Sequence, residues 1–119
     1  MNNLSITVVR DQNGSSVFDT DTLPWNDTRG GDVAVTPFVR ATDIGYLRMA
    51  AGYNSDWHNA PRKQYVLVLE GTMTIRVSNG DQRDFSAGTI LRVEDTSGQG
   101  HCTRDGGGAG VFLAWVPVP

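Results

Sequence analysis

Short runs of β-favouring residues recur along this chain, and residues that favour turns separate one run from the next. The runs are SITVVR (5–10), VAVTPFVRA (33–41), IGYLRMAAG (44–52), QYVLVLEG (64–71), MTIRVSNGD (73–81), TILRVED (89–95) and GVFLAWVPV (110–118). No helical periodicity stands out between them. Short strands at such spacing hide their edges when the sheet closes on itself. The sequence therefore predicts an all-β chain folded as an antiparallel jelly-roll barrel.

Length and charge narrow the class of protein further. At 119 residues the chain fits one domain, and its 14 glycines suit many tight turns. Ten basic and thirteen acidic residues give a net charge of -3 without any block of like charge, which argues against a nucleic-acid partner. The single cysteine, Cys102, excludes an internal disulfide. Without a secretion signal or an apolar run long enough to span a bilayer, we expect a cytoplasmic protein with no membrane partner.

The N-terminal segment has a different character from the rest. After SITVVR comes TDTLPWNDTRGGD (20–32), whose Pro, Asn, Asp and Gly residues favour a loop. We expect residues 1–32 to form a strand or arm that packs on a barrel made by residues 33–119. Phe18 and Trp25 are the side chains that would pin this arm.

Two local patterns predict how central strands are placed. Asn79-Gly80 is a strong signal for a tight hairpin, because type I′ turns need a positive φ at both central residues, so the flanking strands should pair antiparallel. The run QYVLVL (64–69) is apolar at nearly every position, which predicts a strand covered on both faces. The outer cover would be the N-terminal arm or a second subunit.

His58 and His101 are the only histidines in the chain. In a small barrel, ligand side chains converge on the interior from different strands, and neutral imidazole is the commonest protein ligand for first-row metals. Near neutral pH the same side chain also serves as a general acid or base. The two histidines are therefore the first candidates for chemistry.

The spacing in HNAPRKQYVLVLEG (58–71) resembles the first motif of the cupin superfamily. That motif has a His, a second His two positions later, a Glu four positions after that, and a Gly seven positions further. Here these places hold His58, Ala60, Gln64 and Gly71, so two of the four residue types are kept.

The later segment GTILRVEDTSGQGH (88–101) resembles the second cupin motif, which runs Gly, five residues, Pro-x-Gly, two residues and His. Gly88 is followed by five residues, but Glu94 replaces the Pro and His101 comes two positions late. The combination is similar to small single-domain bacterial cupins with a degenerate metal motif. The resemblance implies a single-domain cupin fold and the homodimer usual among cupins, and it leaves the reaction open.

The resemblance implies that the residues remaining at the cupin ligand positions are His58, Gln64 and His101. A neutral amide binds a dication less strongly than a carboxylate does, so this set would hold a divalent Fe, Mn, Ni or Zn ion weakly. The equal alternative is a pocket without a cofactor. In that pocket His58 and His101 transfer protons, and Gln64 orients a substrate carbonyl or enolate.

Strand alternation suggests further pocket residues. If Gln64 points inward, Val66 points the same way and is a candidate for substrate binding. Arg62 is a further catalytic candidate, because it shares that face if the strand has already begun there. Candidates for substrate binding on other segments are Tyr46, Arg48, Arg76, Arg92, Glu94 and Trp57. An inward arginine would pair with a carboxylate or enolate of the substrate. The alternative is that these residues line the solvent face of their strands, with Leu47 and Met49 inward instead.

Three other features are interpreted without a catalytic role. Asp95 lies in VEDTSG (93–98), where Asp and Thr side chains commonly cap a turn. Alternation after His101 turns Cys102 away from the pocket, and no base is placed to activate its thiol. The segment RDGGGAG (104–110) lacks the Lys-Ser/Thr and the helix of a phosphate loop, so it is expected to be a flexible hairpin loop.

Three functions follow from this site. The first is an enzyme that binds a small organic molecule and carries out proton transfer of the isomerase, epimerase, cyclase or lyase type. The second is a metal-dependent dioxygenase, which the loss of a His and a Glu from the first motif disfavours. The third is a module that binds or senses a small molecule without catalysis.

Overall fold

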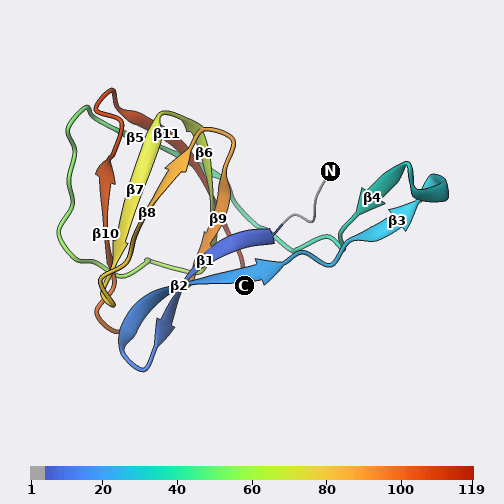
Figure 1. The fold of residues 1–119 in the computed structure, drawn as a ribbon, viewed down its shortest axis with the longest axis horizontal. Helices are drawn as coiled ribbons and strands as arrows, with labels where there is room; N and C mark the ends of the chain where they lie inside the picture. The colour runs from blue at the N-terminus through green and yellow to red at the C-terminus, as the bar shows by residue number, and fades with distance from the viewer. Residues whose placement is uncertain (1–4) are drawn as a thin grey trace.

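The computed structural model describes residues 5–119, and its regular structure is strand apart from one 3-10 turn at Arg29–Gly31. In chain order the strands are β1 (Ser5–Gln12), β2 (Ser15–Thr22), β3 (Asn26–Thr28), β4 (Val33–Val35), β5 (Gly45–Met49), β6 (Gln64–Glu70), β7 (Thr72–Val77), β8 (Gln82–Ser86), β9 (Ile90–Val93), β10 (His101–Asp105) and β11 (Val111–Pro117) (Figure 1). Among these described residues no helix is long and apolar enough to cross a membrane. The predicted all-β class is confirmed.

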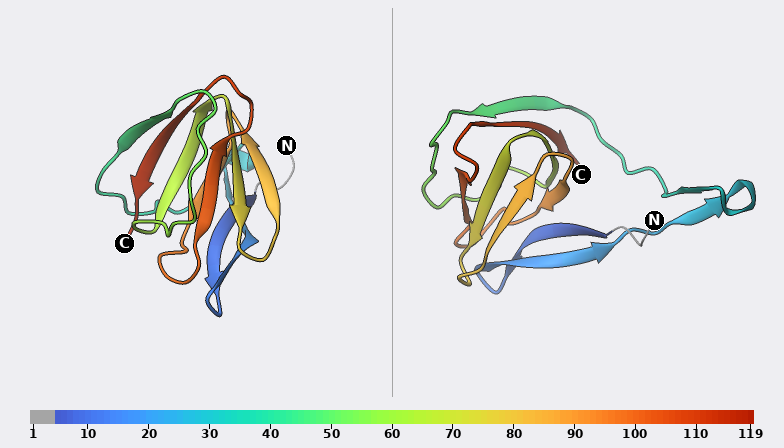
Figure 2. Two further views of the ribbon diagram at one scale, coloured as in Figure 1. Left: turned by 90° about the vertical axis from the view of Figure 1, so that its left-hand side faces the viewer. Right: turned by 45° about the horizontal axis from the view of Figure 1, so that its top comes forward.

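Two sheets form the barrel. A six-stranded sheet in the order β2-β1-β9-β6-β11-β5 lies against a three-stranded sheet in the order β10-β7-β8 (Figures 1 and 2). The core lies between them and includes Met73, Ile75 and Leu91. Every strand pairing among the described residues is antiparallel except that of β1 with β9. The predicted jelly-roll barrel is confirmed, with one parallel contact.

Both Asn-Gly dipeptides lie in hairpin turns. As predicted from Asn79-Gly80, β7 and β8 pair antiparallel. Their loop is wider than a two-residue turn, however, because the Val77 N–H donates to the Asp81 carbonyl at 3.0 Å and Gly80, but not Asn79, has a positive φ, 102°. The two-residue geometry occurs between β1 and β2, where Asn13 and Gly14 have φ of 55° and 86°.

The N-terminal segment contributes strands to the barrel and then leaves it. β1 and β2 form one edge of the six-stranded sheet, and the Phe18 ring packs against the core with its centroid 6.0 Å from that of Phe85. Beyond β2 the hairpin of β3 and β4 projects away from the barrel body (Figure 2). Trp25, just before β3, is 37% exposed. The division at residue 32 stays a prediction, and residues 1–4 lie outside the described residues.

Strand β6 shows the alternation expected from QYVLVL. Gln64, Val66 and Val68 are buried on the inner face. On the outer face Tyr65 and Leu67 are half-buried and Leu69 is exposed. In a single chain the outer cover of this strand is therefore incomplete.

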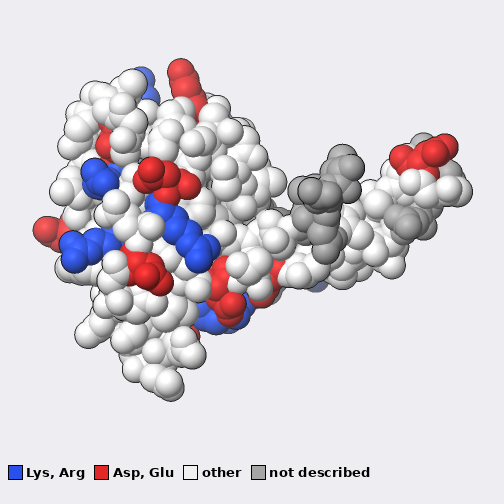
Figure 3. All heavy atoms as spheres, in the orientation of Figure 1, with Lys and Arg blue, Asp and Glu red and all other residues white. Residues whose placement is uncertain are grey.

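Charged side chains are mixed rather than sorted by sign. On the face drawn in Figure 3, basic and acidic groups are interspersed over the barrel and no large patch of one sign forms. This matches the absence of like-charge blocks in the sequence. That nucleic acid is not a partner stays a prediction.

Candidate functional site

A cavity of about 340 Å³ lies inside the barrel, between the two sheets. Four residues predicted for the site line it, namely His58, Gln64, Val66 and His101. The rest of its wall is largely apolar and includes Met49, Ala60, Met73, Ile75, Val93, Leu113 and Trp115. Strands from both sheets thus bring the predicted polar centre into one hydrophobic chamber.

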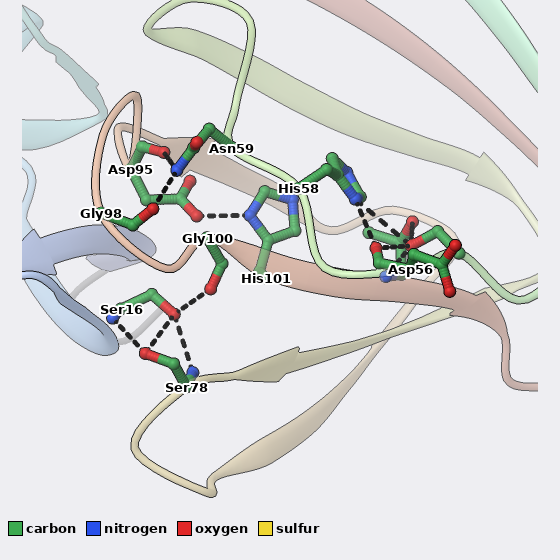
Figure 4. Close-up of polar contacts among 11 residues, drawn as sticks. Ser16, Asp56, His58, Asn59, Ser78, Asp95, Gly98, Gly100 and His101 are labelled. Atoms are coloured by element: carbon green, nitrogen blue, oxygen red, sulfur yellow. Dashed lines mark hydrogen bonds and ion pairs between the residues drawn. The ribbon is translucent and has the colours of Figure 1, made fainter.

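His101 is a buried polar group of the cavity wall and has a buried acidic partner. It begins β10 and is 4% exposed, while Asp95, in the loop after β9, is 0% exposed. His101 Nδ1 lies 2.5 Å from Asp95 Oδ2, and Asp95 Oδ1 is buried without a hydrogen bond among the described residues (Figure 4). Because a carboxylate can only accept, the neutral imidazole carries its proton on Nδ1 and keeps a free lone pair on Nε2.

The interpretation of Asp95 as a turn cap is therefore wrong. Its carboxylate contacts the His101 ring instead of the loop backbone. The backbone carbonyl of Asp95 accepts from the Ala60 N–H at 3.2 Å and from Asn59 Nδ2 at 3.3 Å, and Asn59 also donates to the Gly98 carbonyl. These bonds tie the loop to the segment that carries His58.

His58 lies beside His101 but in a different environment. Their backbones form a two-way bridge, with N–H to carbonyl distances of 2.9 and 2.8 Å, and their ring centroids are 4.6 Å apart. His58 is exposed, and its Nδ1 lies 2.9 Å from the Asp56 carbonyl. A carbonyl can only accept, so this contact also leaves Nε2 as the free nitrogen of a neutral ring.

Gly100 allows this close approach of the two histidine segments. It has a φ of 74°, which L residues rarely adopt, and a Cβ there would lie 2.2 Å from the His58 carbonyl oxygen. The glycine directly before His101 therefore has a structural reason.

Gln64 begins β6, faces the cavity and is 3% exposed. Within residues 5–119 no hydrogen bond of its side-chain amide is found, and the residue borders the cavity. An amide presents both a donor and an acceptor, so it is available to bind a polar group of a ligand.

The predicted arginines do not reach this cavity. Arg62 is exposed outside it, and Arg48 lies exposed on the outer face of β5. Arg92 pairs with Glu94 at 2.7 Å and with Asp21 on the outer face of the six-stranded sheet. Burial disfavours the charged form of Arg92, but interactions with Tyr65, Glu94 and Asp21 favour it more, so its pKa is raised.

Three further candidates lie elsewhere. Tyr46 is 67% exposed and stacks on Phe112 on the outside, whereas Met49, at the end of the same strand, lines the cavity. Arg76 lies over the Trp57 ring, 5.7 Å from its centroid, in a separate surface hollow. The solvent-face alternative therefore describes these residues better than the pocket alternative does.

Cys102 also lies in that outer hollow, as alternation predicts. Burial raises the pKa of its thiol, and Asp56 adds to this effect while Arg76 opposes it. Polar residues at the site that the sequence did not single out are Asn59 and Thr103, which line the cavity, and Asp95, which contacts His101.

The donor set fits a resident metal poorly. Among the described residues no group of three or more His, Cys, Asp or Glu side chains is placed to hold an ion. The cavity offers two imidazoles and one neutral amide, whereas protein sites for transition metals normally supply at least three His, Cys or carboxylate ligands. The one nearby carboxylate, Asp95, is engaged by His101 Nδ1.

Solved structures with the same fold include several cupins. A cupin family protein with a double-stranded β-helix fold from Methanocaldococcus jannaschii aligns with a TM-score of 0.54 and 14% identity, over 80% of this chain and 88% of that one. A cupin domain from Bordetella pertussis aligns with a TM-score of 0.50 and 13% identity, over 64% and 79%. A protein of unknown function from Rhizobium leguminosarum bv. viciae aligns with a TM-score of 0.53 and 24% identity, over 64% and 68%.

No family model and no curated protein matches the sequence. At these identities the likeness to solved structures establishes the fold alone. The chain has a cupin fold, as the spacing of its two motifs predicts.

Proposed function

We propose that this protein is an enzyme that moves protons on a small organic molecule held in the barrel cavity. The observation that carries the proposal is the buried pair of His101 Nδ1 and Asp95 Oδ2, 2.5 Å apart, at the wall of a largely apolar cavity. A histidine oriented by a carboxylate is a common arrangement for a general base, because the carboxylate fixes the tautomer and stabilises the imidazolium that forms.

In the proposed reaction, His101 Nε2 removes a proton from the carbon next to a substrate carbonyl. The electron pair of the broken C–H bond forms the enolate, whose oxygen accepts a hydrogen bond from the Gln64 amide. Return of the proton to the other face or to another carbon gives an epimer or an isomer. Expulsion of a leaving group from the neighbouring carbon instead gives a lyase reaction. His58 Nε2, at the solvent side, exchanges the proton with water or with the intermediate.

The test is incorporation of deuterium from D2O next to the carbonyl of small ketones and aldehydes, followed by NMR. His101→Asn should slow incorporation by about 10²–10⁴-fold, the usual contribution of a general base. Cys102→Ser, one residue away on the opposite face of β10, is the matched control and should leave the rate unchanged. Equal rates for wild type and His101→Asn would contradict the proposal.

The alternatives differ in what they require of the histidines. A module that binds without catalysis would keep most of its ligand affinity when His58 and His101 are both replaced by Ala, whereas the enzyme would lose most of its turnover. A metal-dependent dioxygenase needs a firmly held redox metal, and Ala60 and Gln64 stand where the cupin pattern has His and Glu. A cytoplasmic location and the homodimer stay predictions.

A further inference from the structure

The cavity differs from a site for charged metabolites in the residues that line it. No Lys, Arg, Asp or Glu is among its lining residues in the part of the chain that the structure describes. The five arginines at 48, 62, 76, 92 and 104 lie exposed or on outer faces. An anionic substrate would therefore leave water without a guanidinium or ammonium partner.

The one buried charge close to the cavity is also unfavourable for an anion. Asp95 is fully buried behind His101, and its Oδ1 has no hydrogen-bond partner among the described residues. In this low-dielectric surrounding its negative charge repels a second anion. A cation gains little, because the His101 ring stands between the carboxylate and the cavity.

Polar and apolar groups are separated along the cavity wall. His58, Gln64 and His101 supply hydrogen-bonding groups, and Met49, Met73 and Trp115 supply an apolar wall with two thioethers and an indole. Thioether sulfur and aromatic faces both pack favourably on a flat ring. The volume of about 340 Å³ is at the small end of ligand pockets, which favours a ligand built on one ring.

We infer that the ligand is a neutral, mainly apolar carbonyl compound, with its oxygen at Gln64 and its ring against the methionines and Trp115. This inference names the substrate class of the proposed reaction. The placement of the carbonyl oxygen at Gln64 rests on that proposed function. It replaces the expectation that an arginine pairs with a substrate carboxylate.

The test compares three probes of matched size: acetophenone, benzoate and 1-phenylethylammonium. The protein carries Trp25→Phe and Trp57→Phe, so that the indole N–H signal of Trp115 is the single one in the ¹H–¹⁵N spectrum. Titration of this signal should give an affinity for acetophenone at least tenfold higher than for either ion. Benzoate or the ammonium binding as tightly as acetophenone, or none of the three shifting the signal at millimolar concentration, would overturn the inference.

A variant locates the preference in the cavity. Met49→Lys places a flexible ammonium at the wall and should raise the affinity for benzoate while lowering that for acetophenone. Far-UV circular dichroism checks that the variant is folded. If it is not, the relative affinities of the three probes for the protein without Met49→Lys decide whether the inference holds. A preference for acetophenone without deuterium exchange would refute the proposed reaction and keep the ligand class, so the two failures are distinguishable.

Discussion

At the scale of single residues, the chemistry depends on how differently the two histidines are held. His101 is 4% exposed and bound to a fully buried carboxylate, while His58 is exposed and bound to a backbone carbonyl. A buried histidine with an acidic partner is suited to hold a proton during a reaction, and an exposed one is suited to exchange it with water. The histidines are alike in sequence, and the fold gives them separate roles.

The buried pair makes a prediction about stability. His101→Ala leaves the Asp95 carboxylate buried without a partner, which should lower the free energy of unfolding by about 3–5 kcal/mol. The double variant Asp95→Ala, His101→Ala removes the charge as well, so it should be more stable than the single variant. Urea unfolding at neutral pH measures both, with Cys102→Ser as the control. A double variant less stable than His101→Ala would contradict the expectation that the single variant buries an unpartnered Asp95 charge.

Sequence reasoning found part of this site. His58, Gln64 and His101 followed from motif spacing, and Val66 followed from alternation. Asp95 was missed because an Asp in VEDTSG is also ordinary turn chemistry, and only the path of the loop turns its carboxylate onto a ring six residues later. The sequence does not show whether the strand arginines face the cavity. Which face of a short strand points inward cannot be read from one sequence when both faces carry apolar residues.

At the scale of elements, strands with an apolar pattern could be predicted from the sequence, and strands rich in polar residues could not. The alternation of β6 and the pairing of β7 with β8 agree with the sequence patterns. Strands β2 and β10, SSVFDTDT and HCTRD, are too polar to stand out. Asn13-Gly14 carried a signal for the first hairpin, equal to that of Asn79-Gly80. The parallel pairing of β1 with β9 joins segments distant in sequence, which local patterns do not encode.

The loop between β10 and β11 is held by a buried carboxylate and is not a free hairpin tip. Asp105 accepts from the N–H groups of Gly110 at 2.9 Å, Gly52 at 3.0 Å and Gly108 at 3.0 Å. These donors, that of Gly110 first, hold the pKa of Asp105 below its ordinary value. The glycine-rich segment RDGGGAG is thereby wrapped around one side chain.

This carboxylate makes stability depend on pH in one direction. A group whose pKa is lower in the folded state stabilises the fold fully above its unfolded pKa, about 3.9 for Asp, and this contribution is lost as the pH falls through the folded pKa. Wild type should therefore exceed Asp105→Asn in stability at pH 7, and the gap should shrink below about pH 4. Urea unfolding of both proteins at several pH values measures the gap. A gap that stays constant down to pH 2 would contradict this role.

At the scale of the whole molecule, one surface is unusually apolar for a single chain. The outer face of the six-stranded sheet and the segment after the projecting hairpin expose Phe38 at 105% and Tyr46 at 67%. These two rings alone leave roughly 250–400 Å² of aromatic surface in water. Between that segment and the sheet lies a groove of about 630 Å³, whose lining includes Leu23, Phe38, Tyr65, Leu67 and Ile90.

We expect a second copy of the chain to cover this face, as the doubly apolar β6 predicts. Reciprocal packing of each projecting hairpin on the partner's sheet gives a closed two-fold dimer, and an isolated two-stranded hairpin is at best marginally stable. Wild type should sediment as a dimer at micromolar concentration, and Phe38→Ser with Val39→Ser should sediment as a monomer. Asp81→Asn, in the turn between β7 and β8, is the control. A monomeric wild type would contradict the expectation.

Deuterium exchange by protein from which metal has been removed separates proton transfer by His101 from catalysis by a bound metal. Elemental analysis first establishes the content of Fe, Mn, Ni and Zn before and after chelation. If His101, oriented by Asp95, transfers the proton without a metal, the chelated protein exchanges the substrate α-hydrogen at the wild-type rate, and Asp95→Asn lowers that rate. Exchange that disappears on chelation and returns with one of these metals would contradict the account and make His58, Gln64 and His101 metal ligands.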